Sequence, residues 1–345
     1  MPVSLSRKTF LIGALGAGLM PWLAAAAGAG EAGLLDDLGF SSGKRRAVMD
    51  GEVVALERAA GADDELAGVA AMRLPVPPAE VAHQLRRGLI VRADAAVITQ
   101  RAVAADAGDD GWSAAGFSEE EKGEIVRLFQ VAPGDTFNLS AAEIAKVRVQ
   151  LDGRSPQSGD AAARASAAYR EVLIGRWRSY RNRGAAGLAD YDRGDTATSP
   201  ADGLQRIEVA ARLPALLQPL ARALDSYPAA QPPALESRFY WKKTVVNDRI
   251  AFVLSHVAVA ETEADAVLFA LREYYVGHSY DVLQQLGAVV ADGDGALMLA
   301  VNSTLTDRVA GPLGVIARPI GNRFARAALA DYFVRIRELC RQPLP

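Results

Sequence analysis

Residues 236–245 read ESRFYWKKTV, and residues 250–260 read IAFVLSHVAVA. Both segments are rich in aromatic and β-branched residues, which favour strands. Asn247 and Asp248 lie between them, and both residue types are common in tight turns. The two segments therefore predict an antiparallel hairpin, and this hairpin sets the fold class.

The pattern continues toward the C-terminus. Residues 266–276, 279–290 and 296–305 are three further apolar segments, and Asp292-Gly293-Asp294-Gly295 marks a turn before the last of them. Together the five segments predict an antiparallel meander. The period of residues 266–276 is not clean, so a helix stays open there.

A long terminal helix is expected after Gly311 and Pro312. Its predicted apolar face is formed by Leu329, Tyr332, Phe333, Ile336 and Leu339. The single cysteine, Cys340, falls on the same side and is expected to be a small buried hydrophobe.

Upstream of the meander, residues 51–58 and 65–74 predict another hairpin. Residues 78–87 predict a helix with proline in its first turn, and residues 96–103 predict a strand.

The middle of the chain is predicted to be helical. Ser118 with Glu121, and Ser140 with Glu143, have the spacing of capping boxes, and residues 161–181 form a long amphipathic pattern.

These elements predict an α+β protein in which a curved antiparallel sheet is covered by a long C-terminal helix. Residues 30–345 are expected to form a single domain. It has a largely helical insertion at about 118–226, and the meander with its terminal helix spans 236–342.

Residues 1–29 have the three parts of a secretory signal peptide. Arg7 and Lys8 precede an uncharged apolar run, which ends in small residues with expected cleavage near Ala27 or Ala29. The alternative is a retained membrane anchor, but the run is rich in Ala and Gly and contains Pro21. A periplasmic or secreted protein with no stable membrane span is therefore expected. The string Ser-Arg-Lys-Thr-Phe-Leu resembles a twin-arginine signal with lysine at the second position.

Composition excludes several functions. The formal charge of −3 becomes −5 when the signal is removed, so no basic face for nucleic acid is expected. One cysteine and three histidines give no basis for a zinc site, and the Asp292 turn lacks the later ligands of a calcium loop. No metal and no cofactor are predicted.

Residues 277–281, Gly-His-Ser-Tyr-Asp, resemble the nucleophile elbow of α/β-hydrolases, but Asp281 replaces the final glycine. No histidine follows Ser279 in the chain. A tight connection between strands is therefore favoured, and no catalytic residue is assigned.

Aromatic residues gather in the meander. We interpret them either as cross-strand packing pairs or as the lining of an apolar cavity, beside charged residues such as Lys242 and Glu273, some of which would orient a ligand head group. The candidate ligand-binding residues are Arg238, Tyr240, Trp241, Tyr274, Tyr275, His278 and Tyr280.

Two resemblances accompany these patterns. The meander, its terminal helix and the phrase MRLPVPPAEVAHQL at 72–85 resemble START-type helix-grip domains. That likeness implies a terminal helix that closes an apolar cavity on the sheet. Motifs such as Tyr191-Asp192-Arg193-Gly194 and residues 275–280, YVGHSY, resemble uncharacterised exported bacterial proteins, which imply no activity.

Three functions follow as hypotheses. The first is an exported, non-catalytic protein that binds a lipid or other apolar ligand between the sheet and the C-terminal helix. The second is a periplasmic hydrolase that uses His278 and Ser279. The third is an envelope protein–protein interaction module whose helical region, residues 118–181, binds a partner.

Overall fold

A computed structural model describes residues 31–104, 108–210, 213–229, 231–262, 265–310 and 314–342. The predicted signal peptide, residues 1–29, lies outside this part of the chain.

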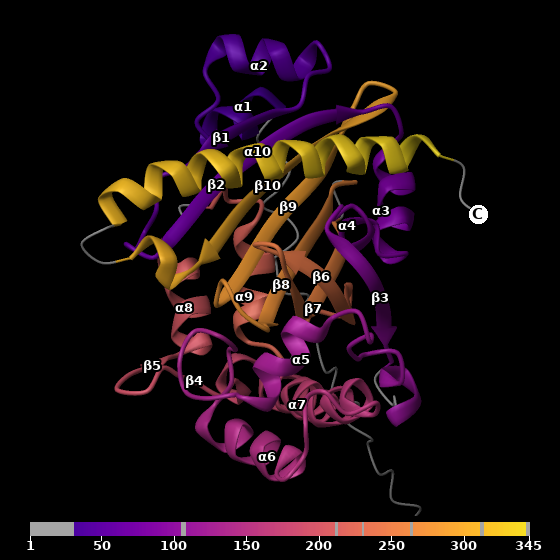
Figure 1. Cartoon of the computed structure of the whole chain (residues 1–345). Helices are drawn as coiled ribbons and strands as arrows, with labels where there is room; N and C mark the ends of the chain where they lie inside the picture. The colour runs from indigo at the N-terminus through magenta and orange to yellow at the C-terminus, as the bar shows by residue number, and fades with distance from the viewer. Residues whose placement is uncertain are drawn as a thin grey trace, which may run out of the picture.

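One large antiparallel sheet organises the protein (Figure 1). It has eight strands in the order β1-β2-β10-β9-β8-β7-β6-β3, and a small second sheet pairs β4 with β5. The strands are β1 Val54–Glu57, β2 Glu65–Leu74, β3 Val97–Val103, β4 Tyr191–Asp192, β5 Ala197–Thr198, β6 Leu235–Val246, β7 Arg249–Glu261, β8 Val267–Val276, β9 Val282–Asp292 and β10 Gly295–Leu305.

The helices cover the sheet and form a separate layer at one of its ends (Figure 1). The α-helices are α1 Glu31–Asp37, α2 Ser42–Met49, α3 Pro78–Arg86, α4 Leu89–Arg92, α5 Lys122–Phe129, α6 Ala141–Leu151, α7 Ala161–Arg183, α8 Pro200–Ala210, α9 Gln218–Asp225 and α10 Gly314–Arg341. Short 3-10 turns lie at Asp109–Trp112, Gly184–Gly187 and Asp307–Val309.

The predicted meander is confirmed, and each of its strands pairs with the next. Asn247 and Asp248 connect β6 to β7 with φ angles of 50° and 59°, as a two-residue hairpin turn of the primed type requires. The ambiguous segment 266–276 forms strand β8, not a helix. Its side chains are buried along its whole length, which explains why no clean alternation marks it.

The helical insertion lies between two strands that are neighbours in the sheet. It begins after β3 and ends before β6, yet β3 and β6 pair with each other, with Val103 opposite Phe239. The insertion leaves and re-enters the sheet at neighbouring strands, and its helices α5, α6 and α7 extend from one end of the sheet (Figure 1).

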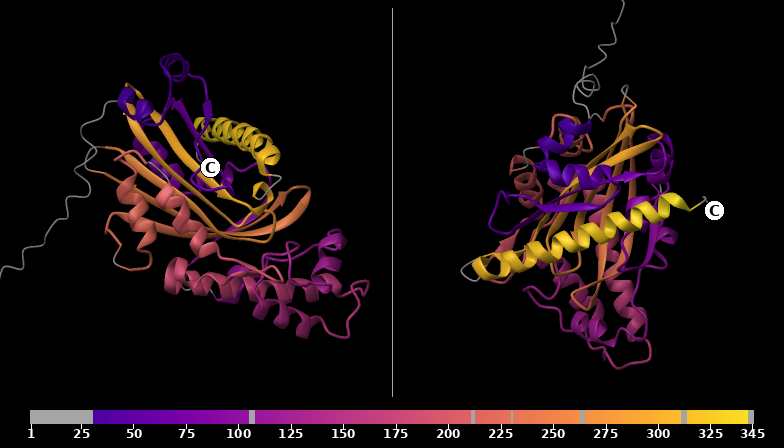
Figure 2. Two further views of the ribbon diagram at one scale, coloured as in Figure 1. Left: turned by 90° about the vertical axis from the view of Figure 1, so that its left-hand side faces the viewer. Right: turned by 90° about the horizontal axis from the view of Figure 1, so that it is seen from above.

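Helix α10 lies in the hollow of the curved sheet (Figure 2). Its buried residues Leu329, Phe333, Ile336 and Cys340 pack with helices α3 and α4 on strands β2, β8, β9 and β10. The apolar face predicted for the terminal helix is therefore confirmed, as is the burial of Cys340.

The opposite face of the sheet is covered by α1, α2 and α9, whose apolar side chains form a second core with residues such as Leu268, Leu286 and Leu299. Helices α5, α6, α7 and α8 form a third core with the end of the sheet. The sheet is thus covered on both faces.

The two predicted capping boxes have different outcomes. Ser140 and Glu143 form the complete reciprocal pair at the start of α6. The box at Ser118 is wrong, because α5 begins only at Lys122 and its N-cap residue Glu121 makes no side-chain cap. The Glu121 carboxylate binds Lys243 at 2.6 Å instead, and accepts a hydrogen bond from the Ser118 amide.

Candidate functional site

A cavity of about 250 Å³ lies between α10 and the hollow face of the sheet. Its volume falls just under the range of roughly 300–1,000 Å³ typical of small-molecule sites. The cavity is lined by Ile90, Asp94, Lys242, Leu271, Glu273, Tyr280, Leu283, Gln285, Asn302, Thr304, Ala325, Ala328, Leu329 and Tyr332.

The apolar part of the lining comes from both layers. Leu271 and Leu283 project from β8 and β9, and Ala325, Ala328 and Leu329 come from α10. Ala328 is exposed and Ala325 is half-buried, so the cavity opens beside this turn of the helix. Small side chains there leave space that leucine or phenylalanine would fill.

A charged cluster forms the other part of the lining. Lys242 Nζ lies 2.6 Å from Glu273 Oε1 and 2.8 Å from Asp94 Oδ2, and both Lys242 and Glu273 are buried. Tyr280 Oη donates a hydrogen bond to Glu273 Oε2 at 2.5 Å. Burial is the largest single influence on the pKa of Lys242 and lowers it, but the charges and hydrogen bonds of Glu273 and Asp94 together outweigh burial, so the pKa lies above the ordinary value. Lys242 is therefore charged at neutral pH.

Helix α10 also fixes the position of Asp94. Tyr332 Oη donates to the carbonyl of Ile90 at 2.7 Å, and Arg335 Nε donates to the carbonyl of Ala93 at 3.2 Å. These bonds hold the end of α4, and Asp94 follows directly after Ala93. The terminal helix thereby supports both the apolar and the charged part of the lining.

Uncharged polar side chains complete the sheet side of the cavity. Gln285 on β9 is opposite Leu271 on β8 and Asn302 on β10. Asn302 donates to Thr304 at 3.4 Å, which is a long hydrogen bond. Gln285 is 3% exposed, and its Oε1 atom is buried without a hydrogen-bond partner among the described residues. One side chain of the cavity wall therefore carries an unsatisfied acceptor.

The predicted ligand-binding residues are divided between different sites. Tyr280 lines the cavity, and Tyr240 packs in the same core with its hydroxyl beside Gly88. Arg238 is exposed and pairs with Glu236 at 3.7 Å. Trp241, Tyr274 and Tyr275 belong to the core formed with the helical insertion.

A β-bulge explains the position of the two consecutive tyrosines. Leu254 is opposite Tyr275 but Ser255 is opposite Glu273, so Tyr274 is the extra residue. Both tyrosines therefore face the insertion: Tyr274 stacks on Tyr180 at 3.9 Å, and the Tyr275 hydroxyl lies 2.6 Å from that of Tyr169. Glu273 keeps its place on the cavity side.

Sequence reasoning named Lys242 and Glu273 among the charged residues of the meander but missed Asp94, Gln285, Asn302 and Thr304. A signal for Gln285 was present, because two consecutive glutamines, Gln284 and Gln285, interrupt the apolar residues of a predicted strand. No sequence signal pointed to Asp94, since it comes close to Lys242 on β6 only through the tertiary fold.

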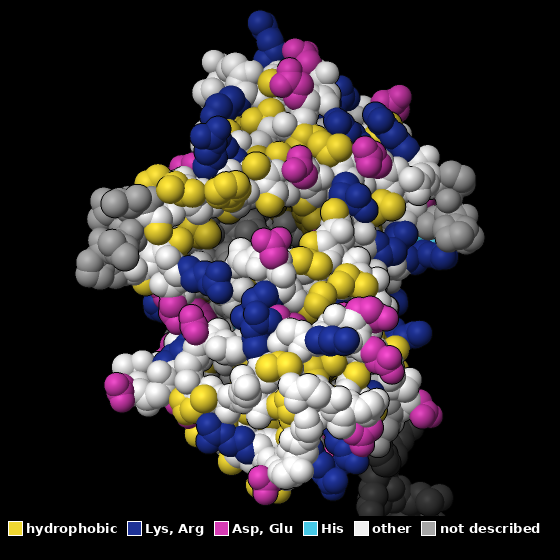
Figure 3. All heavy atoms as spheres, viewed as in Figure 1, with side chains coloured by type: hydrophobic (Ala, Val, Ile, Leu, Met, Phe, Trp, Pro, Cys, Tyr) yellow, Lys and Arg dark blue, Asp and Glu magenta, His cyan; other side chains and the backbone are white. Residues whose placement is uncertain are grey.

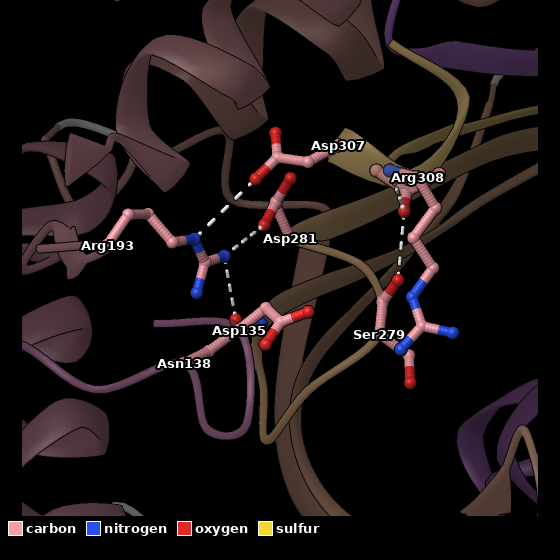
Figure 4. A pocket seen from close by; sticks show the side chains of 8 residues that line it. Asp135, Asn138, Arg193, Ser279, Asp281, Asp307 and Arg308 are labelled. Atoms are coloured by element: carbon pink, nitrogen blue, oxygen red, sulfur yellow. Dashed lines mark hydrogen bonds and ion pairs between the residues drawn. The ribbon is translucent and has the colours of Figure 1, made fainter. Parts of the chain in front are cut away.

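A second, more polar pocket of about 190 Å³ lies at the connection between β8 and β9 (Figure 4). Arg193 reaches into it from the β4–β5 hairpin and binds Asp281 at 3.0 Å and Asn138 at 2.8 Å. Burial, and then the nearby Asp307 carboxylate, raise the pKa of Asp281 to about 7 despite the opposing charge of Arg193.

Ser279 lines this second pocket, and its neighbour His278 is buried behind it. His278 Nδ1 is 2.6 Å from Ser279 Oγ, and His278 Nε2 is 3.0 Å from the carbonyl of Ile250. The carbonyl requires a proton on Nε2, so Nδ1 accepts from the serine hydroxyl. Burial, and then the charge of Arg249, lower the pKa of His278 to about 4, which makes it a weak base at neutral pH.

Within the described segments, no group of three or more His, Cys, Asp or Glu side chains is placed to hold a metal ion. None of the helices in that part of the chain is both long and apolar enough to cross a membrane.

Comparisons with known proteins give weak structural similarities. No protein-family model matches the chain, and no curated protein matches it. The crystal structure of TTHA0849 from Thermus thermophilus is similar with a TM-score of 0.23 and 13% identity, over 32% of this chain and 70% of that one. The crystal structure of Ara h 8.0201 has a TM-score of 0.21 and 8% identity, over 33% and 70% of the two chains. Scores this low support no conclusion about fold or function.

Proposed function

We propose that this is an exported, non-catalytic protein that binds a small apolar or amphipathic molecule beneath α10. The observation that carries the proposal is the cavity of about 250 Å³, which has an apolar wall and a charged cluster. Its lining matches the general composition of ligand sites, in which a few polar groups orient a mainly apolar molecule.

The size of the cavity narrows the class of ligand. A volume of about 250 Å³ accommodates a single short chain or a small ring system. A two-chain phospholipid would have to leave most of its length outside. We therefore propose a small amphipathic molecule and not a membrane lipid enclosed whole.

Export is part of this proposal and rests on the sequence of residues 1–29. The positive residues Arg7 and Lys8, the apolar run and the small-residue end together support a periplasmic or secreted location. Sequencing the N-terminus of the protein recovered from the periplasmic fraction tests this point. A start near residue 28 or 30 is expected, and a chain that keeps residue 1 in the cytoplasm would contradict export.

Extraction of the purified protein tests ligand binding. Small molecules that co-purify with the wild-type chain would be extracted into organic solvent and identified by mass spectrometry. The matched control is Leu283→Trp, which fills the cavity from β9. A compound present at near-stoichiometric amount in the wild type and depleted in the variant supports the proposal, whereas equal amounts in both contradict it.

A hydrolase is the second candidate function, favoured by the distance of 2.6 Å between His278 and Ser279. Ser279 has a φ of 79°, a strained conformation that also occurs at catalytic nucleophiles. Labelling with a fluorophosphonate probe tests it, with Ser279→Ala as the control. Labelling that depends on Ser279 would favour the hydrolase. No labelling of this protein, under conditions in which the probe labels a reference serine hydrolase completely, would reject the hydrolase.

A further inference from the structure

The buried amide of Gln285 gives the cavity a chemical preference. Its Oε1 atom accepts no hydrogen bond from the described residues, although only 3% of the residue is exposed. An acceptor buried without a partner destabilises the folded state compared with a satisfied one. The oxygen has almost no accessible surface as it stands, so the side-chain amide has to turn toward the cavity before a ligand can donate a hydrogen bond to it and recover this free energy.

The charges of the lining also disfavour a ligand that carries a negative charge. Asp94 and Glu273 are the carboxylates of the cavity lining and Lys242 is its cation, so the formal charge of the lining is negative. The ammonium of Lys242 is already shared between the two carboxylates, at 2.8 and 2.6 Å. The hydroxyl of Tyr280 is directed to Glu273. An anionic head group would therefore meet a net like charge, and it would find the Lys242 ammonium and the Tyr280 hydroxyl already engaged.

From the unsatisfied acceptor and the excess of carboxylates, we infer that the ligand carries a hydrogen-bond donor without negative charge, an alcohol or an amine, on a short apolar body. This inference rests on the proposed function, because it specifies the ligand of the same cavity. It excludes fatty acids and other carboxylates as preferred ligands.

A matched series of short ligands tests the inference. Octan-1-ol, octylamine and octanoate share one chain and differ in the head group, and naphthalene serves as a probe without a donor. Dissociation constants would be measured by isothermal titration calorimetry at pH 8, and by fluorescence for naphthalene. The alcohol and the amine are expected to bind at least about tenfold more tightly than octanoate, because each gains one satisfied hydrogen bond and avoids repulsion by the carboxylates. Octanoate binding as tightly as the alcohol would overturn the inference.

Gln285→Leu separates this inference from the proposed function. The variant is expected to lower the affinity for octan-1-ol about tenfold and to leave the affinity for naphthalene unchanged. Gln150→Leu, at an exposed position on α6, is the control and should change neither. If naphthalene binds but the preference for the alcohol survives in Gln285→Leu, the inference alone fails. If neither naphthalene nor any member of the series binds the wild type, the proposed function fails and the inference falls with it.

Discussion

Lys242 on β6 and Glu273 on β8 are joined by an ion pair of 2.6 Å that passes over the intervening strand β7. Neither residue is opposite the other in the sheet, since Lys242 is opposite Val253 and Glu273 is opposite Ser255. Asp94 adds a third charge from the end of α4. The cluster therefore links the sheet to the helices that enclose the cavity.

Replacing Lys242 tests the energetic importance of this cluster. Lys242→Met leaves the buried Glu273 carboxylate without its cation, and removing one member of a buried pair costs about 3–5 kcal/mol. We expect the free energy of unfolding, measured in urea, to fall by that amount. Lys146→Met on the exposed face of α6 should change it by less than about 0.5 kcal/mol. A loss for Lys242→Met as small as the control would mean that the cluster is solvated and not a buried network.

The raised pKa of Asp281 predicts a dependence of stability on pH. Its folded pKa of about 7 exceeds the ordinary value of 3.8, so between these values the folded state binds more protons than the unfolded state. The contribution of Asp281 to stability is therefore present below pH 4 and is lost as the pH rises through 7. Asp281→Asn should become progressively more stable relative to the wild type from pH 4 to pH 8. A constant difference between the two proteins over this range would show that Asp281 has an ordinary pKa.

The opposite dependence is expected for His278. Its folded pKa of about 4 lies below the ordinary value of 6.5, so the unfolded state binds the additional proton between these values. The contribution of the neutral imidazole is present above pH 6.5 and is lost as the pH falls through 4. His278→Gln keeps a donor for the Ile250 carbonyl and should show a smaller loss of stability between pH 7 and pH 4.5. Parallel curves for the variant and the wild type would contradict the burial of a neutral histidine.

Phenylalanine variants of Tyr275 and Tyr280 distinguish an aromatic residue that stabilises the fold from one that lines the ligand cavity. Tyr275→Phe leaves the buried hydroxyl of Tyr169 without its partner, and should lower stability by about 1–2 kcal/mol with no effect on naphthalene affinity. Tyr280→Phe removes the donor to Glu273 in the cavity wall and should change the ratio of alcohol to carboxylate binding. Denaturant unfolding and calorimetry on both variants check the two expectations. A change in naphthalene affinity with Tyr275→Phe would instead place the ligand near the insertion.

Strand propensity and turn residues were sufficient to predict the meander, because Asn247 and Asp248 occupy positions that require positive φ. The terminal helix was also predictable, since one apolar stripe included Phe333 and Ile336, which are fully buried.

The candidate site was less accessible to sequence reasoning. Counting alternate residues from Glu273 places Tyr275 on the cavity side, but the bulge at Tyr274 turns it toward α7. A bulge depends on pairing with the neighbouring strand, which a single segment does not reveal. Likewise, the aromatic cluster has partners on the insertion, such as Tyr180, that lie far away in the chain.

The exposed side of α10 carries hydrophobic side chains, and replacing them tests whether the ligand site extends to the outer face of the helix. Hydrophobic side chains gather along this helix in Figure 3. Within the helix, Ile320 is 54% exposed and Phe324 is 71% exposed. Replacing both with serine should leave naphthalene affinity unchanged, because neither residue lines the cavity. A fall in affinity measured by fluorescence titration would extend the site to the outer face of the helix.

The most direct test of the account is the affinity of naphthalene for the wild type, Leu283→Trp and Leu283→Ala. Leu283 lies in the cavity wall, so tryptophan fills the space and alanine enlarges it. Saturable binding of one naphthalene is predicted for the wild type and for Leu283→Ala, with loss of binding in Leu283→Trp while its circular dichroism spectrum stays unchanged. Equal affinity in all three proteins, or no binding to the wild type, would contradict a ligand site beneath α10.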